Sequence, residues 1–229
     1  MTKLRPLGND YRYKRIIGTG GLGTGMFFKL QGNHTLGRNE SRLGDRLPYR
    51  VYCKQHIILH YISVFLSGES FEVFPIGRVG DDEQGRQILR EMAGSGMKMH
   101  GVKIQPGAST LFSVCFIYPD STGGNITTSS SASSMVEPSD ITDFMALIDG
   151  GGISAFGNEY SRDRDVPTIM LATPEVPVET RIQLLKEGRK RKFFNAASVL
   201  SGEVDEFCSA SGFELTDLLS VNMTKLLPF

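Results

Sequence analysis

The feature that most constrains the fold is a repeated alternation between short apolar segments and amphipathic segments. Apolar runs typical of buried strands lie at residues 15–18, 71–76 and 168–172. Apolar side chains at helical spacing lie in segments that follow such runs or stand between them, at 51–66, 82–94 and 178–192. Strand and helix units repeated in series predict a mostly parallel sheet with helices on both faces, which is a three-layer α/β sandwich.

Shorter segments extend this pattern without changing it. Strand-like runs lie at 102–104, 111–118 and 193–195, a short amphipathic helix is predicted over 141–148, and 213–221 is predicted to pass from helix to strand. Two polar stretches, at about 20–48 and 111–136, do not fit the alternation, and the second has the composition of a hairpin that turns at 120–125. We expect these two stretches to form a small β lid on the main sheet, within one domain over residues 1–229.

Charge and cysteine content limit the classes of function. The 25 lysines and arginines balance 25 aspartates and glutamates, so a general binder of nucleic acid or of a membrane surface is not expected. No stretch approaches the roughly 18 uninterrupted apolar residues of a membrane span, and residues 1–13 lack the apolar run of a signal peptide. The three cysteines are scattered, as in a protein with reduced thiols. These observations predict a cytoplasmic protein.

A G-x-G-x-x-G sequence runs from Gly18 to Gly23, directly after the first predicted strand. Such glycines bind the pyrophosphate of a dinucleotide when they open a helix. Here the following residues contain too many further glycines for a helix of useful length. We therefore expect a glycine-rich crossing beside a pocket, and keep a dinucleotide-dependent enzyme as an alternative.

Several segments, in order, resemble the PfkB (ribokinase-like) family of carbohydrate kinases. Residues 75–86 are similar to its strand–turn–helix with the pattern G-x-V-G-x-D-x-x-G, and 110–118 to a strand that opens on threonine. Residues 171–180 are similar to an acidic turn with proline after a buried strand, 194–197 to an N-x-A turn, and 217–222 to the strand that leads into the family's N-x-x-E motif. The resemblance covers about residues 15–222 and implies the family's three-layer sandwich with a β lid.

The resemblance implies ATP-dependent phosphorylation of a hydroxyl group on a sugar or nucleoside, with Mg²⁺ as the metal. Carried onto this sequence, the substrate-binding residues would be Thr110, Glu175 and Asn195, and Asn222 would lie on the nucleotide side. Glu175 follows a buried strand, which is where open α/β sheets bind ligands. A helix-capping role for Glu175, and turn-forming roles for Asn195 and Asn222, remain open.

The sequence also departs from the family. No G-x-G-D segment, which supplies the family's catalytic aspartate, occurs in the 229 residues, and the N-x-x-E position reads Asn222-Met223-Thr224-Lys225. The aspartate that follows the first strand in the family has no counterpart between Gly18 and Gly25. We therefore assign no catalytic residue and no metal ligand. The expectation is a truncated kinase, without the C-terminal part of the fold, that is inactive alone.

Three alternatives stay open. The chain could be a non-catalytic sugar-binding or regulatory protein that retains this fold. His56 and His60 are four residues apart on one helical face, which suits either metal binding or packing beside the pocket, and the absence of an acidic third ligand favours packing. The predicted lid could pair with a second copy to form a homodimer.

Overall fold

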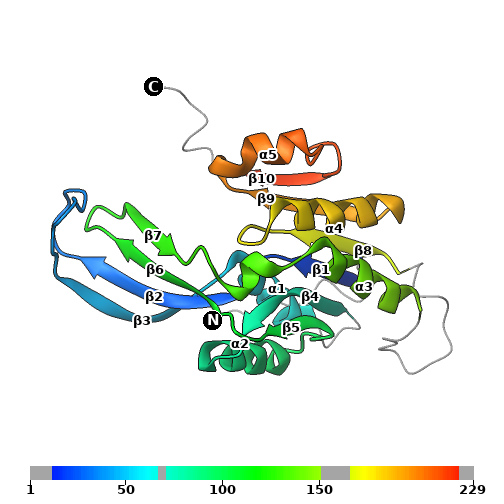
Figure 1. Ribbon diagram of the computed structural model, residues 1–229, viewed down its shortest axis with the longest axis horizontal. Coiled ribbons are helices and arrows are strands. Elements are labelled where there is room, and N and C mark those ends of the chain that lie inside the picture. The colour runs from blue at the N-terminus through cyan, green and yellow to red at the C-terminus, as the bar shows by residue number, and fades with distance from the viewer. Residues whose placement is uncertain (1–11, 67–70, 151–165, 222–229) are drawn as a thin grey trace.

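The computed structural model of the chain describes residues 12–66, 71–150 and 166–221. In these residues a six-stranded sheet has the order β10-β9-β8-β1-β4-β5, with every neighbouring pair parallel. Its strands are β1 (Arg15–Thr19), β4 (Glu72–Gly80), β5 (Gly101–Gln105), β8 (Thr168–Ala172), β9 (Phe194–Val199) and β10 (Leu218–Val221). Figure 1 shows a second, smaller sheet that projects from this one.

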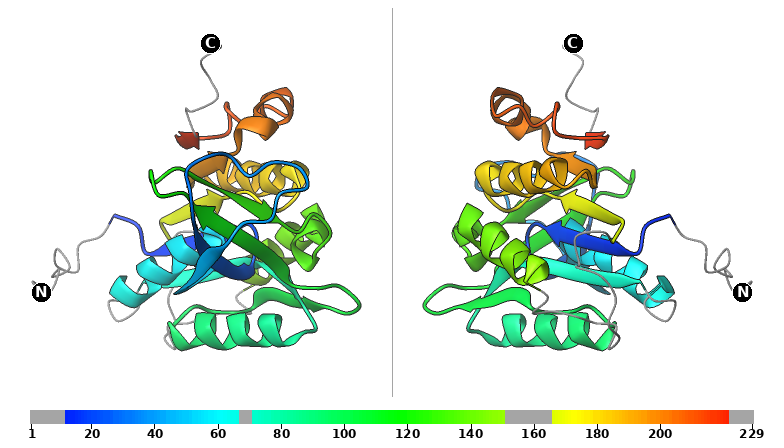
Figure 2. Two further views of the ribbon diagram at one scale, coloured as in Figure 1. Left: turned by 90° about the vertical axis from the view of Figure 1, so that its left-hand side faces the viewer. Right: turned by 90° about the vertical axis from the view of Figure 1, so that its right-hand side faces the viewer.

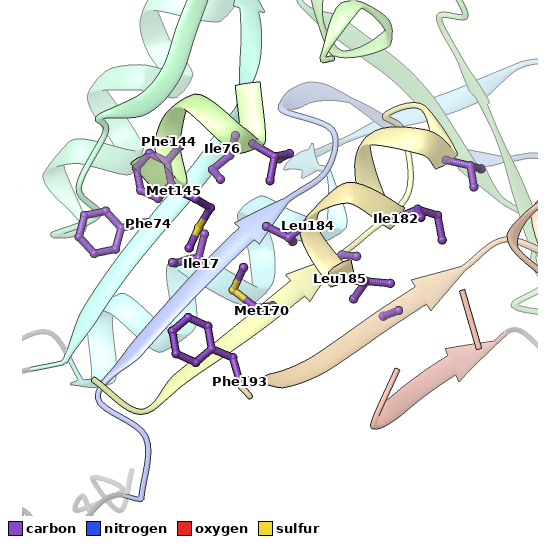
Figure 3. Packing of buried hydrophobic residues seen from close by; sticks show 14 of the residues in the cluster. Ile17, Phe74, Ile76, Phe144, Met145, Met170, Ile182, Leu184, Leu185 and Phe193 are labelled. Carbon is purple, nitrogen blue, oxygen red and sulfur yellow. The ribbon is translucent and has the colours of Figure 1, made fainter. Parts of the chain in front are cut away.

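Helices cover both faces of the six-stranded sheet, as Figure 2 shows. Alternate side chains of β1 point to opposite faces, so Ile16 and Ile17 belong to two separate cores. Ile16 packs with apolar side chains of α1 (Lys54–Leu66) and α2 (Glu83–Gly94). Ile17 packs with side chains of α3 (Pro138–Asp149), α4 (Val178–Lys190) and α5 (Val204–Ser209), and Figure 3 shows this second core. The predicted three-layer α/β sandwich is confirmed.

The smaller sheet, called the lid here, joins two distant parts of the sequence. Its order is β3-β2-β6-β7, from β2 (Gly23–Leu30), β3 (Gly44–Tyr52), β6 (Leu111–Ile117) and β7 (Gly123–Thr127). β2 pairs antiparallel with β3 and parallel with β6, and β6 and β7 form an antiparallel hairpin. Pro48 is tolerated in β3 because this strand lies at the edge of the lid.

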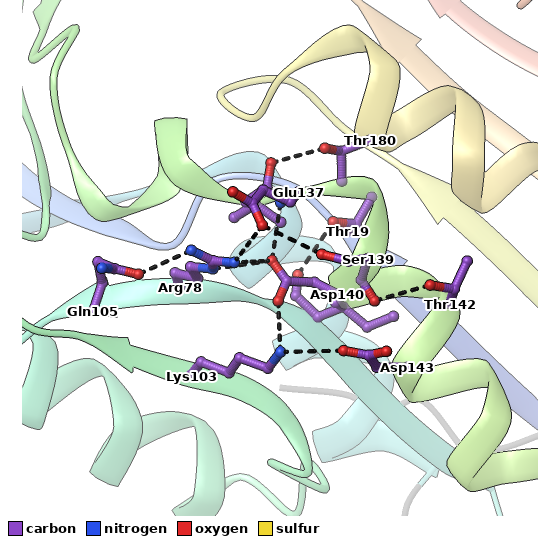
Figure 4. A network of polar contacts seen from close by, with 12 residues as sticks. Thr19, Arg78, Lys103, Gln105, Glu137, Ser139, Asp140, Thr142, Asp143 and Thr180 are labelled. Carbon is purple, nitrogen blue, oxygen red and sulfur yellow. Dashed lines mark hydrogen bonds and ion pairs between the residues drawn. The ribbon is translucent and has the colours of Figure 1, made fainter.

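A polar network ties α3 to the edge of the larger sheet (Figure 4). Asp140, in the first turn of α3, accepts hydrogen bonds from Arg78 of β4 at 2.9 Å and from Lys103 of β5 at 2.7 Å. Burial alone would raise the pKa of Asp140, but the backbone N–H of Glu137 and the two basic side chains outweigh it and lower that pKa. The carboxylate is therefore charged and fully used in joining three elements.

In two of the predicted segments the structure has a different kind of element over part of the range. The helix predicted from residue 51 begins at Lys54, because Val51 and Tyr52 are the last residues of β3. The passage from helix to strand predicted over 213–221 is wrong in its helical part: the helix lies earlier, as the six-residue α5, and turns lead from it into β10. A short 3-10 turn, Ser201–Glu203, precedes α5, and another, Ala132–Met135, precedes α3.

Candidate functional site

Glu175 lies at the end of β8, where the larger sheet faces the base of the lid. Its φ of 72° is in the left-handed region that side chains other than glycine rarely occupy, which is a form of strain common at ligand sites. The glycine-rich crossing from β1 to β2 passes directly beside it, and Gly21 N donates to Pro174 O at 2.9 Å. A Cβ at Gly21 would lie 2.5 Å from Cβ of Glu175, so this close approach requires glycine.

The carboxylate of Glu175 is poorly compensated. Burial raises its pKa, and Glu203 nearby raises it further, while Lys54 and Arg181 act in the opposite direction. Oε2 of Glu175 is buried and has no hydrogen-bond partner among the described residues. Glu175 as a whole is half-buried and lines two cavities, so a hydroxyl-bearing ligand in either cavity would contact the accessible part of its carboxyl group.

Lys54 and Cys53 stand opposite Glu175, at the start of α1. Nζ of Lys54 donates to Oγ of Ser198 at 2.7 Å, which places its ammonium group between α1 and β9. Cys53 is buried, and burial, together with the charge of Glu175, raises the pKa of its thiol. The thiol is therefore protonated at neutral pH and is not a nucleophile.

Two adjoining cavities share Glu175 in their walls. One, of about 290 Å³, lies between the lid and α1 and has polar side chains on its lid side, at Thr24, Ser113 and Asn125. The other, of about 460 Å³, combines apolar side chains, such as Leu111 and Val176, with hydroxyl and carboxylate ones, among them Thr127, Thr128, Ser129, Ser131, Glu179 and Glu203. Together they form a cleft rich in hydrogen-bonding groups, centred on Glu175 and suited to a polyhydroxylated ligand.

Thr110 serves a different structural purpose. Its Oγ1 donates to Oδ1 of Asp82 at 2.6 Å and accepts from Gly80 N at 2.9 Å, and its backbone N–H donates to Oδ2 of Asp82 at 2.7 Å. Asp82 is the N-cap of α2, so Thr110 fixes the start of that helix and the entry into β6. Leu111, the next residue, lines the 460 Å³ cavity. Contact between Thr110 and a substrate stays a prediction.

The side chain of Asn195 also bonds groups inside the protein and does not face the cleft. Its Nδ2 donates to Leu185 O at 2.8 Å and to Leu215 O at 2.7 Å, and its side chain is fully buried. Of the three predicted substrate residues, the structure therefore brings Glu175 to the cleft and gives Thr110 and Asn195 other partners. Asn222 lies outside the described residues.

The remaining sequence features also have structural roles. Gly18–Gly23 carries the chain from β1 into strand β2 rather than into a helix, so the context for dinucleotide binding is missing. His56 is buried against Tyr52, with ring centroids 4.5 Å apart, which confirms the packing interpretation for this residue. In the part of the chain that the structure describes, no group of three or more His, Cys, Asp or Glu side chains could hold a metal ion. Nor is any described helix both long and apolar enough to span a bilayer.

The residues that sequence reasoning missed are Lys54, Ser113 and Asn125. Ser113 could have been noticed as the one hydroxyl side chain in the otherwise apolar run 111–117, although no alternation of polar and apolar residues marks it. Lys54 and Asn125 give no such signal, since each reaches the cleft only through the way the lid folds over α1.

No protein-family model and no curated protein matches the sequence. Solved structures match in fold. The ribokinase of Giardia lamblia has a TM-score of 0.69, with 14% identity over 91% of this chain and 57% of its own. A nucleoside kinase of Burkholderia thailandensis in complex with inosine has a TM-score of 0.64, with 14% identity over 92% of this chain and 62% of its own. A ribokinase of Arabidopsis thaliana, complexed with ribose and ATP, has a TM-score of 0.58 and 16% identity, over 93% of this chain and 62% of its own.

These likenesses show that the chain has a partial ribokinase-like fold, as the sequence resemblance implied. The chain spans about three-fifths of the length of these structures, between 57% and 62%. The part of the fold described here includes the lid and the larger sheet up to β10.

Proposed function

We propose that the chain forms the substrate-binding part of an ATP-dependent kinase that acts on a sugar or a nucleoside. The cleft between the lid and the carboxyl end of β8 would hold the sugar. Glu175 would accept hydrogen bonds from its hydroxyl groups, and Ser113 and Asn125 would contact it from the lid. The observation that carries this proposal is the half-buried, poorly compensated carboxyl group of Glu175 in the wall of a cleft that also presents hydroxyl and amide groups.

Phosphoryl transfer needs more than the described residues assemble. Mg²⁺ prefers carboxylate ligands, and no metal-binding cluster exists in residues 12–66, 71–150 and 166–221. In kinases Mg²⁺ is held by one or two carboxylates together with the phosphates of the nucleotide, so the expectation of low activity rests on the G-x-G-D sequence, which does not occur in the 229 residues. We expect the chain alone to show little or no turnover of ATP with any sugar, and detectable phosphorylation would contradict this.

The second candidate, a sugar-binding or regulatory protein without catalysis, is favoured by the same observation. The described cleft has the chemistry for recognising a polyol without the chemistry for transferring a phosphoryl group. Saturable binding of a sugar without binding of ATP to the same chain would select this candidate, and binding of both would favour the kinase.

Calorimetric titration with ribose tests the proposed site. We expect saturable binding that Glu175→Gln weakens by about tenfold, because an amide loses the charge-assisted hydrogen bonds. Glu214→Gln is the matched control, since Glu214 is exposed and lines none of the cavities named above. Equal affinity in the two variants would exclude Glu175 from the site.

A further inference from the structure

A cavity of about 540 Å³, called the basal cavity here, lies at the amino ends of strands in the larger sheet. Its lining includes Tyr13, two residues before β1, and the first residues of β8 and β9, which are Thr168 and Phe194. Glu175 follows the carboxyl end of β8, so the five residues of this strand, about 17 Å in length, separate the basal cavity from the cleft. A small ligand in the basal cavity would therefore not reach the cleft.

Aromatic and other apolar side chains form one part of the lining. The rings of Tyr13 and Phe194 have centroids 5.7 Å apart, with their planes tilted by 47°. Both residues are half-buried, and Phe193 and Pro167 line the cavity beside them. A planar aromatic group would pack on these surfaces, because offset and edge-to-face contacts between rings are favourable. The volume of the cavity lies within the range of small-molecule sites.

Basic side chains form the other part of the lining. Arg12, Arg189 and Lys192 are its three basic residues, and Asp217 is its one carboxylate. Arg189 pairs with Asp217 at 2.9 Å, so these two charges compensate each other. Arg12 and Lys192 are exposed and form no ion pair with any described residue. Cζ of Arg12 lies 5.4 Å from the centroid of the Tyr13 ring, which places a positive charge beside the aromatic surface. Two uncompensated positive charges favour an anionic ligand.

The backbone conformation at Lys192 is one that usually selects glycine. Lys192 comes shortly after the end of α4 and has a φ of 59°, in the left-handed region. The N–H of Phe193 donates to Gly188 O at 2.9 Å, which is the bond that closes a helix end of the glycine type. A lysine at this position costs backbone strain relative to glycine. A ligand that uses the ammonium group would account for a lysine here.

We propose that the basal cavity binds a small aromatic anion, such as an aryl phosphate or an aryl carboxylate, at a site separate from the cleft. The cleft has the opposite charge, since its 460 Å³ cavity is lined by no basic side chain and by the carboxylates of Glu175, Glu179, Glu203 and Glu206. An aromatic anion would be repelled there and attracted to the basal cavity. The chain as a whole has no net charge, which favours a small ligand over nucleic acid.

The experiment measures binding of phenyl phosphate to the purified chain by calorimetry, with inorganic phosphate as the anion alone and benzyl alcohol as the ring alone. We expect phenyl phosphate to bind at least tenfold more tightly than either. Lys192→Gln should weaken it about fivefold, because a charge-assisted contact is lost. Lys190→Gln is the matched control and should have no effect, since Lys190 is exposed at the same helix end but lies outside the cavity.

A second variant separates loss of the ligand contact from damage to the fold. Lys192→Gly suits the left-handed backbone, so it should weaken phenyl phosphate as much as Lys192→Gln does without lowering the free energy of unfolding. Unchanged affinity in this variant would exclude the ammonium group of Lys192 from the site.

The remaining outcomes separate this proposal from the proposed function. Equal affinity for phenyl phosphate and inorganic phosphate would overturn the aromatic half of the proposal. Equal weakening by Lys192→Gln and Lys190→Gln would show attraction to the helix end in general and would overturn the assignment to the cavity, as would absence of binding. Glu175→Gln should leave phenyl phosphate binding unchanged, and ribose should not compete with it. Competition by ribose would place the anion in the cleft and overturn a separate site.

Discussion

The six-stranded sheet and the lid contain strands of comparable length but of opposite character. Every residue of β1 is buried, whereas in β3 at the edge of the lid no residue is buried. The larger sheet has helices on both faces and is the stable scaffold. The lid supplies polar side chains and the ring of Tyr52 to the cleft. The difference indicates that the larger sheet carries most of the stability, and under the proposed function the lid and Glu175 would carry ligand recognition where the two sheets meet.

The largest loss of stability is expected when a buried ion pair in the larger sheet is broken. Arg15 of β1 and Glu72 of β4 are each 1% exposed, with Nε of Arg15 2.8 Å from Oε2 of Glu72. Glu72→Ala deprives a buried guanidinium of its carboxylate and should lower the free energy of unfolding by about 3–5 kcal/mol in urea denaturation. The paired variant Arg15→Met/Glu72→Met should recover most of this. A loss below about 1 kcal/mol for Glu72→Ala would contradict the scaffold role.

The second largest effect is a loss of stability at acidic pH, which depends on His56 where the lid meets α1. Burial lowers the pKa of His56 from 6.5 to about 4 in the folded chain, so as the pH falls from 6.5 the unfolded state takes up the proton first. This contribution to stability is complete above pH 6.5 and is lost progressively down to pH 4, by up to about 3 kcal/mol.

His56→Phe should remove that part of the pH dependence, which thermal unfolding between pH 7 and pH 4 can measure. His100→Phe is the control, because His100 is exposed. Identical pH profiles for the native chain and His56→Phe would show that His56 is not the responsible group.

A smaller effect is expected where β6 of the lid leaves the scaffold. Asp82 caps α2 through Gly85 N at 2.8 Å and also bonds Thr110. Asp82→Ala should destabilise the chain by about 1–2 kcal/mol. Asp81→Ala provides the control, since Asp81 is exposed and pairs only with Arg86 among the described residues. Similar losses in the two variants would argue against the capping network.

The smallest change in the free energy of unfolding is expected for a substitution within the lid. Ile126 of β7 is 69% exposed, so Ile126→Thr should change the free energy of unfolding by less than about 0.5 kcal/mol. The equivalent change in the scaffold, Val73→Thr, puts a hydroxyl into a residue that is 1% exposed and should cost more than about 1 kcal/mol. Equal costs, measured by the same urea denaturation, would remove the contrast between the two sheets.

The scaffold was predictable from sequence because its strands are buried on both faces and therefore appear as apolar runs, as in β1 and β8. In the lid, β6 and its hairpin with β7 were predicted, as the strand-like run 111–118 and the hairpin over 111–136, but β2 and β3 were not predicted as strands. β3 is exposed on both faces, so neither burial nor alternation marks it. The helix α5 was missed because six residues are too few for helical periodicity to show.

The candidate site was only partly predictable for a similar reason. Glu175 follows a recognisable strand, and its position at the strand's end predicted its place in the cleft. Thr110 follows the family pattern equally well, yet its hydroxyl is used by Asp82, a partner 28 residues away in the sequence. A further cavity, of about 580 Å³, is lined by aromatic side chains of β2, β3 and α1, and no local pattern predicts how those elements meet.

The central claim, that the cleft beside Glu175 is the substrate site, is tested most directly by mapping a ribose titration with amide NMR. We predict saturable shift changes confined to residues that line the cleft, among them Val51, Lys54, Ser113 and Glu175. Amides of β5, at the far edge of the larger sheet, should not move. Saturable changes elsewhere with none at these positions, or no saturable change at all, would contradict the claim.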